Sequence, residues 1–345
     1  MKRQLPKRPA SRASKRHHER EKLRLSEIYQ SVRDDLTEGE RQFKLLAEDK
    51  RDNFPELHRM LKHVLVGGKV IRPALTLLSG RLFSYNRDRT LPMATASELL
   101  HIATLVHDDA IDEADTRRGR PTVNKLWGLD KAVLLGDYLF ARAGEFAAAT
   151  ESIRVVRLFA RTLQIISSGE LKQAFGAFSL EQSFEQYRER IAGKTAALIV
   201  MATESGAILG SASEEEIQIM KDYGYNLGLA FQIVDDILDF IGDEKEMGKP
   251  VGSDLAQGTI TLPSLLLLKR HPADNPVAKI FAGKEPAENI RRAVAMISSS
   301  SIIDESYSTA QDYISEACQH LKRLPDSQHR RSLLDLADYI IRRQK

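Results

Sequence analysis

The sequence predicts an all-α protein, and three observations support that fold class. Apolar residues recur at spacings of three and four along most of the chain, which is the period of an amphipathic helix. Strict alternation of apolar and polar residues, the pattern of a half-buried strand, is nowhere sustained. Glycine- and proline-rich breaks fall between the helical stretches. We therefore expect one large bundle of ten or more helices with no internal domain boundary.

The breaks allow the expected helices to be followed along the chain. A long apolar helix is expected between Leu91 and Ile111, after the glycine pair at 67–68 and before the break at 119–121. A second such helix runs from Leu227 to Ile241 and stops before the glycines at 248–252. Two further breaks, at 272–276 and in the serine run 298–301, divide the C-terminal part into shorter helices.

Composition narrows the class of protein. The 345 residues are 42% hydrophobic and 29% charged, which is ordinary for a folded domain and excludes wholesale disorder. The single cysteine, Cys318, excludes an intramolecular disulfide framework and any cysteine-clustered zinc or iron–sulfur site, and it fits a reducing compartment. Unbroken apolar runs such as 196–202 are far shorter than a membrane span. We expect a soluble, cytoplasmic protein.

The formal net charge of +3 hides an asymmetric distribution. Residues 1–25 carry ten Lys or Arg and two Glu, so the rest of the chain is net acidic. We interpret residues 1–22 as a disordered basic arm and residues 23–345 as the folded domain. The arm is either a solvated tail or a segment weakly attracted to anionic lipid or nucleic acid. We expect no nucleic-acid-binding function for the protein.

One acidic motif, Asp-Asp-x-x-Asp, occurs twice, each time at the end of an apolar helical stretch. Residues four apart lie within about 40° on a helix, so the first and last aspartates of each copy share a face. A single copy is as readily explained by a solvated helix surface, but two copies in apolar helices indicate a metal site. Such oxygen ligands favour Mg²⁺, which commonly bridges to substrate phosphates. The six candidate ligands are Asp108, Asp109, Asp112, Asp235, Asp236 and Asp239.

Basic residues near these motifs supply charge that would attract a phosphate. Lys69 and Arg72 follow the glycine pair, and their spacing of three predicts that they share one helical face. Arginine binds phosphate oxygens bidentately and lysine acts as a point charge. Metal-binding acids combined with these cations indicate diphosphate chemistry, whereas the glycine loops of nucleotide-binding folds are missing from the sequence. Further basic candidates are Arg117, Arg118, Lys194 and Lys249.

From about Ile28 to the C-terminus, the sequence resembles the trans-isoprenyl diphosphate synthases, also called polyprenyl synthetases, and their long-chain members most of all. The segments that carry the resemblance are GGKVIRP (67–73), LLHIATLVHDDAIDEADTRRGRPTVN (99–124), GKTAAL (193–198), GLAFQIVDDILDF (228–240) and GKPVGSDLAQGTITLP (248–263). The resemblance implies the isoprenoid synthase fold, a helical bundle around a deep central cavity. It also implies a homodimer that uses several Mg²⁺ ions per site.

The resemblance further implies head-to-tail chain elongation, in which an allylic diphosphate ionises and isopentenyl diphosphate attacks the cation before losing a proton. The aspartates would hold the metal ions on the allylic diphosphate. Other groups implied around that diphosphate are Arg117, Lys194 and Lys249. The diphosphate of isopentenyl diphosphate would be held by Lys69, Arg72, His101 and Arg118. Thr195 and Gln232 would stabilise the cation through oriented dipoles.

Spacing along the first long helix adds two expectations. His101 lies seven residues before Asp108, about 20° from the same stripe, and we expect it to face the cavity, whereas His107 lies off the stripe and is expected to be structural. Ala103 and Thr104 precede Asp108 by about one turn, where short-chain relatives carry bulky aromatic residues as a floor. The small residues here predict a long-chain product, heptaprenyl to decaprenyl.

Several alternatives stay open. The chain could make a shorter product, geranylgeranyl or farnesyl diphosphate, or could be the catalytic subunit of a two-component synthase. A terpene cyclase or head-to-head synthase would have less need for the second diphosphate site, and a non-catalytic subunit would typically lose one acidic motif. Peripheral association with a membrane would help to release a lipid product. The chain departs from many relatives at three positions: Val70 and Thr259 replace basic residues, and Ala110 replaces a larger aliphatic residue.

Overall fold

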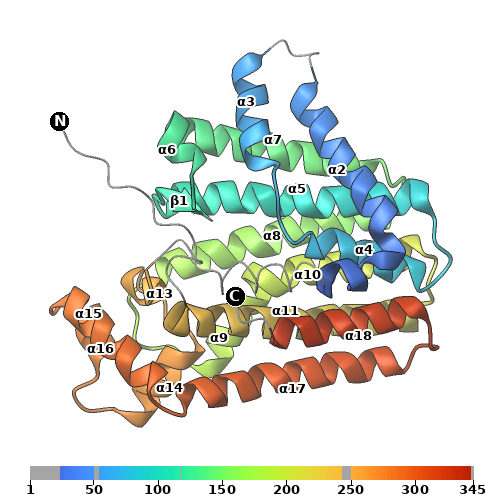
Figure 1. Cartoon of the computed structure of the whole chain (residues 1–345). Coiled ribbons are helices and arrows are strands. Elements are labelled where there is room, and N and C mark those ends of the chain that lie inside the picture. The colour runs from blue at the N-terminus through green and yellow to red at the C-terminus, as the bar shows by residue number, and fades with distance from the viewer. Residues whose placement is uncertain (1–23, 50–53, 118, 243–249, 343–345) are drawn as a thin grey trace.

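A computed structural model describes residues 24–49, 54–117, 119–242 and 250–342 of the chain. Those residues are almost entirely helical and form one bundle, as the sequence predicts (Figure 1). The expected basic arm at 1–22 lies outside the described residues. The only strands in the described ranges are the two-residue strands β1 (Thr116–Arg117) and β2 (Arg120–Pro121), which pair antiparallel.

The helices follow one another with short connections. The N-terminal half contains the 3₁₀ turn η1 (Gln30–Val32), α2 (Arg33–Glu48), α3 (Pro55–Val64), α4 (Ile71–Arg81), α5 (Arg87–Ile111), α6 (Val123–Trp127), α7 (Leu129–Ala148) and α8 (Ile153–Phe175). The central elements are α9 (Phe184–Ile191), the π-helical turn η2 (Ala192–Ala196), α10 (Ala197–Leu209) and α11 (Glu214–Ile241). The C-terminal part contains α13 (Ser253–Ala256), α14 (Leu262–Arg270), α15 (Pro276–Phe281), α16 (Pro286–Ser298), α17 (Ile302–Lys322) and α18 (Gln328–Ile341).

Helix α11 lies in the middle of the bundle, between α10 on one side and α17 on the other (Figure 1). The small residue Gly228 allows α11 to approach the turn η2 closely. A Cβ atom on Gly228 would lie 2.5 Å from the Cα atom of Ala196, so only glycine fits there. This close packing places α11 directly against η2, and the candidate site is built at that junction.

A second close contact joins α5 to α7. The imidazole of His107 occupies the space beside Gly136, where an added Cβ atom would lie 2.1 Å from Nε2. The ring packs edge-on against Phe140, and its Nε2 lies 3.0 Å from the carbonyl oxygen of Val133. His107 therefore holds two helices together, which agrees with the structural role expected from the sequence.

The breaks predicted from the sequence fall where helices end. The run 298–301 separates α16 from α17, and 272–276 separates α14 from α15. One prediction at a break is wrong: Lys69 and Arg72 do not share a helical face, because α4 begins only at Ile71. The backbone of Val70 adopts a left-handed conformation, with φ 42° and ψ 37°, and Lys69 precedes this turn as part of the loop.

The continuous helical run Phe184–Leu209 is long and apolar enough to cross a membrane by length and composition alone. However, 61% of its most apolar window is buried inside the protein. Its side chains pack against α4, α8 and α11, so the apolar character is explained by a central position in the bundle.

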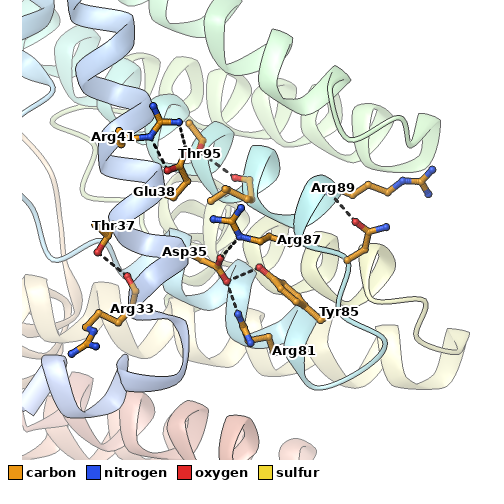
Figure 2. Close-up of polar contacts among 12 residues, drawn as sticks. Arg33, Asp35, Thr37, Glu38, Arg41, Arg81, Tyr85, Arg87, Arg89 and Thr95 are labelled. Carbon is orange, nitrogen blue, oxygen red and sulfur yellow. Dashed lines mark hydrogen bonds and ion pairs between the residues drawn. The ribbon is translucent and has the colours of Figure 1, made fainter.

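The N-terminal end of α2 is attached to the bundle by one buried carboxylate. Asp35 is 2% exposed and accepts hydrogen bonds from Arg81 at 2.6 Å, Tyr85 at 2.7 Å and Arg87 at 2.7 Å (Figure 2). The Arg81 guanidinium also lies over the Tyr85 ring, 4.3 Å from its centroid. Burial alone would raise the pKa of Asp35, but the three donors outweigh burial and hold the pKa below its ordinary value.

We predict that Asp35→Asn destabilises the folded protein by about 2 kcal/mol at pH 7, because the substitution leaves two guanidinium groups without their anion. A carboxyl group with a lowered folded-state pKa contributes stability above its unfolded-state pKa of about 4 and loses that contribution as the pH falls further. The difference between the two proteins should therefore shrink below about pH 4. Urea unfolding monitored by circular dichroism, at pH 7 and below pH 4, measures this difference in the free energy of unfolding. Asp34→Asn, at a side chain that is 95% exposed on the same helix, is the matched control; equal losses in both variants would refute the prediction.

Candidate active site

The first acidic motif lies at the C-terminal end of α5, as predicted. Asp108 is half-buried, Asp109 is 6% exposed, and Asp112 is the exposed residue that caps the helix. Burial raises the pKa of Asp108 to about 6; the ammonium of Lys194 opposes this shift, while Glu170 adds to it. Asp109 accepts a hydrogen bond from Nε of Arg117 at 2.8 Å, which anchors the β1–β2 hairpin beside the motif.

The cation that faces this motif comes from the π-helical turn η2. Burial would lower the pKa of Lys194, but Asp108 and Glu170 raise it overall, so the side chain stays charged. Its Nζ lies 2.9 Å from Oε1 of Glu170 on α8. A π-helical turn adds a residue to a helix and is often found at functional sites. Here the turn places Lys194 near α5 and Thr195 against α11.

The second acidic motif occupies the last turns of α11. The carboxylate of Asp236 is 3% exposed and accepts hydrogen bonds from the Tyr187 hydroxyl at 2.7 Å and the Gln232 amide at 2.8 Å. Burial and the nearby carboxylate of Asp254 raise the pKa of Asp236 to about 7, against the effect of these two donors. The Thr195 hydroxyl in turn donates to the Gln232 side-chain oxygen. The sequence analysis gives Thr195 and Gln232 the same role but does not predict that they touch. In the structure the two side chains are in contact.

The third aspartate of this motif fixes the following loop. Asp239 is 1% exposed and accepts hydrogen bonds from the Ser253 hydroxyl at 2.7 Å and from the backbone N–H of Asp254 at 3.2 Å. Asp235, the first aspartate, is half-buried on the same helix. Two basic residues predicted at this site, Arg118 and Lys249, lie outside the described residues.

Both motifs lie at helix C-termini, and this position increases the electrostatic cost. The last turn of a helix carries the negative end of its dipole, so carboxylates there are repelled by the backbone as well as by each other. Two carboxylates about 5 Å apart repel by about 3 kcal/mol at an effective dielectric of 20. Such an arrangement is stabilised by cations, and the oxygen donors suit Mg²⁺ or another hard divalent ion.

The described residues do not yet form a complete metal cage. Within residues 24–49, 54–117, 119–242 and 250–342, no three acidic, histidine or cysteine side chains are gathered closely enough to hold a metal ion by themselves. Mg²⁺ typically uses only one or two carboxylates and completes its shell with water and substrate phosphate oxygens. The aspartates of the two helix ends are oxygen donors of the kind that Mg²⁺ uses in this way.

Two further predicted residues lie at the start of α4: Lys69 precedes the helix and Arg72 is in its first turn. The third residue predicted with them, His101, is half-buried on α5. The Tyr29 hydroxyl donates to the backbone carbonyl of Lys69 at 3.0 Å. The ring of Tyr339, from α18, lies under the Lys69 ammonium, 5.5 Å from Nζ to the ring centroid.

The two residues predicted to control product length lie in different surroundings. Ala103 is fully buried, in a core cluster to which α5, α7 and neighbouring helices contribute. Thr104 is half-buried, and its hydroxyl donates to the carbonyl of His101 at 2.7 Å, so its polar group is satisfied within the helix.

Sequence reasoning missed three polar residues at the site. Glu170 pairs with Lys194, Tyr187 bonds Asp236, and Arg190 lies over the Tyr187 ring while donating to the carbonyl of Ile260. Each belongs to a helix with no motif of its own. One sequence signal could have indicated that α8 packs beside Lys194: a single glycine in each of two helical stretches, Gly169 and Gly193. The helix α8 and the turn η2 touch at these two glycines.

Comparison with known proteins places this geometry in a family. A sequence model described as polyprenyl synthetase matches residues 54–297. The chain is 37% identical over 325 residues to heptaprenyl diphosphate synthase component 2 of Geobacillus stearothermophilus, which covers 93% of this chain and 99% of that protein.

Solved structures agree. The crystal structure of a heptaprenyl diphosphate synthase from Staphylococcus aureus matches with a TM-score of 0.86 and 35% identity, covering 91% of this chain and 98% of that one. A polyprenyl synthase from Caulobacter crescentus, complexed with calcium and isoprenyl diphosphate, matches with a TM-score of 0.85 and 33% identity over 93% and 98% of the two chains. This chain belongs to the polyprenyl synthetase family and is a prenyltransferase with the isoprenoid synthase fold.

Proposed function

We propose that this member of the polyprenyl synthetase family is a long-chain trans-polyprenyl diphosphate synthase, which condenses isopentenyl diphosphate head-to-tail onto an allylic diphosphate. One observation carries the proposal: consecutive residues of η2 reach both acidic helix ends. Lys194 interacts electrostatically with Asp108 and Asp112 of α5, and Thr195 hydrogen-bonds Gln232, one turn before Asp236 on α11. The two motifs are thus linked through one turn of the chain and can serve one substrate.

Within this proposal, the six aspartates serve two roles. Asp109, Asp236 and Asp239 accept hydrogen bonds from protein groups, so we infer that they also orient the helix ends and the adjoining loops. Mg²⁺ would be held by carboxylates of both motifs, and Asp108 and Asp112, which share a helix face beside Lys194, would contribute from the first. When bound, the metal would supply positive charge to the oxygens of the leaving diphosphate.

Residues of the chain itself would add charge at the diphosphate, stabilise the cation and bind the second substrate. Lys194 adds charge beside Asp108 and stays protonated despite burial. Arg117 is held by Asp109 at the rim of the site, with its side chain 38% exposed toward an incoming diphosphate. The polar pair formed by Thr195 and Gln232 is locked by Asp236, so its dipoles are fixed before a cation develops. Isopentenyl diphosphate would bind at Lys69, Arg72 and His101, with its double bond toward the allylic cation, and would lose one proton after attack.

We propose that the chain acts as a homodimer through α7 and α8. Large apolar side chains on these helices are exposed, among them Leu134 at 65% on α7, and Ile153 at 73% and Phe175 at 90% on α8. A monomer rarely exposes so many large apolar groups on neighbouring helices unless another surface covers them. The name of the Geobacillus relative, component 2, favours one alternative: the chain is the catalytic subunit of a two-component synthase.

The direct test is incubation of the purified chain with MgCl₂, isopentenyl diphosphate and allylic primers of different lengths, followed by chromatography of the products. We predict elongation, and a fall in kcat of at least about 100-fold in Asp108→Asn, because that substitution removes a carboxylate from the leaving-group site. Asp34→Asn, at a side chain 95% exposed on α2, is the control and should leave turnover unchanged. Absence of elongation by the chain alone and with a candidate partner would refute the proposed function.

Product length follows from the small residues on α5. We predict products of seven to ten prenyl units for the unaltered chain, and shorter ones for Thr104→Phe, because a bulky ring at this half-buried position would block a tail growing past this turn. Ala103 is fully buried among packed helices, so Ala103→Phe would first disturb that packing. Ile111→Phe places the same ring at a position 69% exposed on the same helix and should not change the product. Unchanged lengths in Thr104→Phe would show that the tail does not pass this turn.

A further inference from the structure

The loop lysine Lys69 is held in place by two tyrosines from opposite ends of the chain. Tyr29 is 6% exposed, and its hydroxyl donates to the Lys69 carbonyl at 3.0 Å. Burial, followed by the neighbouring Tyr339 and Glu98, raises the pKa of Tyr29 well above its ordinary value, so the hydroxyl keeps the proton that it donates. This bond fixes the backbone of Lys69 immediately before the left-handed turn at Val70.

The second tyrosine acts on the side chain. Tyr339 is 2% exposed on α18, and its ring lies 5.5 Å from Nζ of Lys69, within the range of a cation–π interaction. The guanidinium of Arg24 lies 6.0 Å from the same centroid and pairs with Asp338 on the same helix. Two cations therefore lie within 6.0 Å of the centre of this ring, and one of them is also tied to α18 through Asp338.

The backbone at Val70 explains why such support is needed. A β-branched residue with φ 42° is in a conformation that costs about 1–3 kcal/mol and persists only where the surroundings enforce it. This turn separates Lys69 from α4, so the helix does not set the direction of the lysine as it does that of Arg72. The contacts from Tyr29 and Tyr339 orient Lys69 instead.

We propose that Tyr29 and Tyr339 are positioning residues that hold the Lys69 ammonium for the diphosphate of isopentenyl diphosphate. The C-terminal helix α18 thereby becomes part of that substrate's site without touching the substrate. The proposal rests on the proposed function, which assigns Lys69 to isopentenyl diphosphate.

The test compares Tyr339→Leu with Tyr339→Phe in steady-state kinetics with each substrate varied in turn. Removing the ring in Tyr339→Leu should raise KM for isopentenyl diphosphate about 3- to 30-fold and leave KM for the allylic primer within about twofold. Tyr339→Phe keeps the ring face and should restore the first KM. Tyr29→Phe, which loses the bond to the Lys69 carbonyl, should raise the same KM about 3- to 10-fold.

Tyr223 provides a matched control, since it is another buried tyrosine whose hydroxyl donates to a backbone carbonyl, that of Leu333, at 2.8 Å. Tyr223→Phe removes a bond that attaches α18 at Leu333 but leaves the Tyr339 ring in place, and it should leave both KM values unchanged. A parallel rise of both KM values in Tyr339→Leu, or no rise, or a failure of Tyr339→Phe to restore the value, would overturn the proposal.

A measurement without turnover separates this proposal from the proposed function. Acetylation of lysines by a water-soluble amine-reactive ester, followed by mass spectrometry, should show faster labelling of Lys69 in Tyr339→Leu than in the unaltered chain. The exposed Lys44 and Lys62 are internal references. Unchanged labelling of Lys69 overturns the positioning contact whatever the activity. Faster labelling in a chain that neither binds isopentenyl diphosphate nor elongates primers refutes the proposed function, and the substrate assignment falls with it.

Discussion

The burial of carboxylates at two helix ends is the constraint on which this structure depends. Two long helices, α5 and α11, each end in three aspartates, at the pole where the helix dipole is also negative. Burial is the main cause of the raised pKa values of Asp108 and Asp236, and nearby carboxylates, Glu170 for the first and Asp254 for the second, add to it. A fold that served stability alone would avoid this arrangement. The proposed binding of a cation and a diphosphate at the helix ends would account for it, in helices that are otherwise apolar.

The rest of the architecture brings these helix ends within reach of one cationic turn. Gly228 lets α11 contact η2 closely, and Gly169 and Gly193 meet where α8 contacts η2. Because no side chains separate these backbones, the extra residue of the π-helical turn can direct Lys194 to one helix and Thr195 to the other. Elsewhere, buried polar groups such as Asp35 attach the outer helices to this centre.

The fold class, the long helices and the location of both acidic motifs could be predicted from the sequence, because helical periodicity and a repeated motif are local signals. What could not be predicted depends on contacts between distant segments. The spacing of Lys69 and Arg72 suggested a shared helical face, but the tertiary structure imposes a left-handed Val70 between them, against its intrinsic preference. The role of Glu170 was missed for the same reason. A single acidic residue on α8 is ordinary in the sequence, and its ion pair with Lys194 forms only because α8 packs beside η2.

The central claim is that the acidic helix ends bind a divalent cation together with a diphosphate. Thermal unfolding of the purified chain in MgCl₂ alone, in sodium pyrophosphate alone and in both tests it without any catalysis. A ligand that binds only the folded state raises Tm, and joint binding should raise it by at least about 2 °C more than the two separate effects combined. Magnesium with sulfate in place of pyrophosphate controls for ionic strength. A Tm that responds to the mixture no more than to its parts would contradict the account.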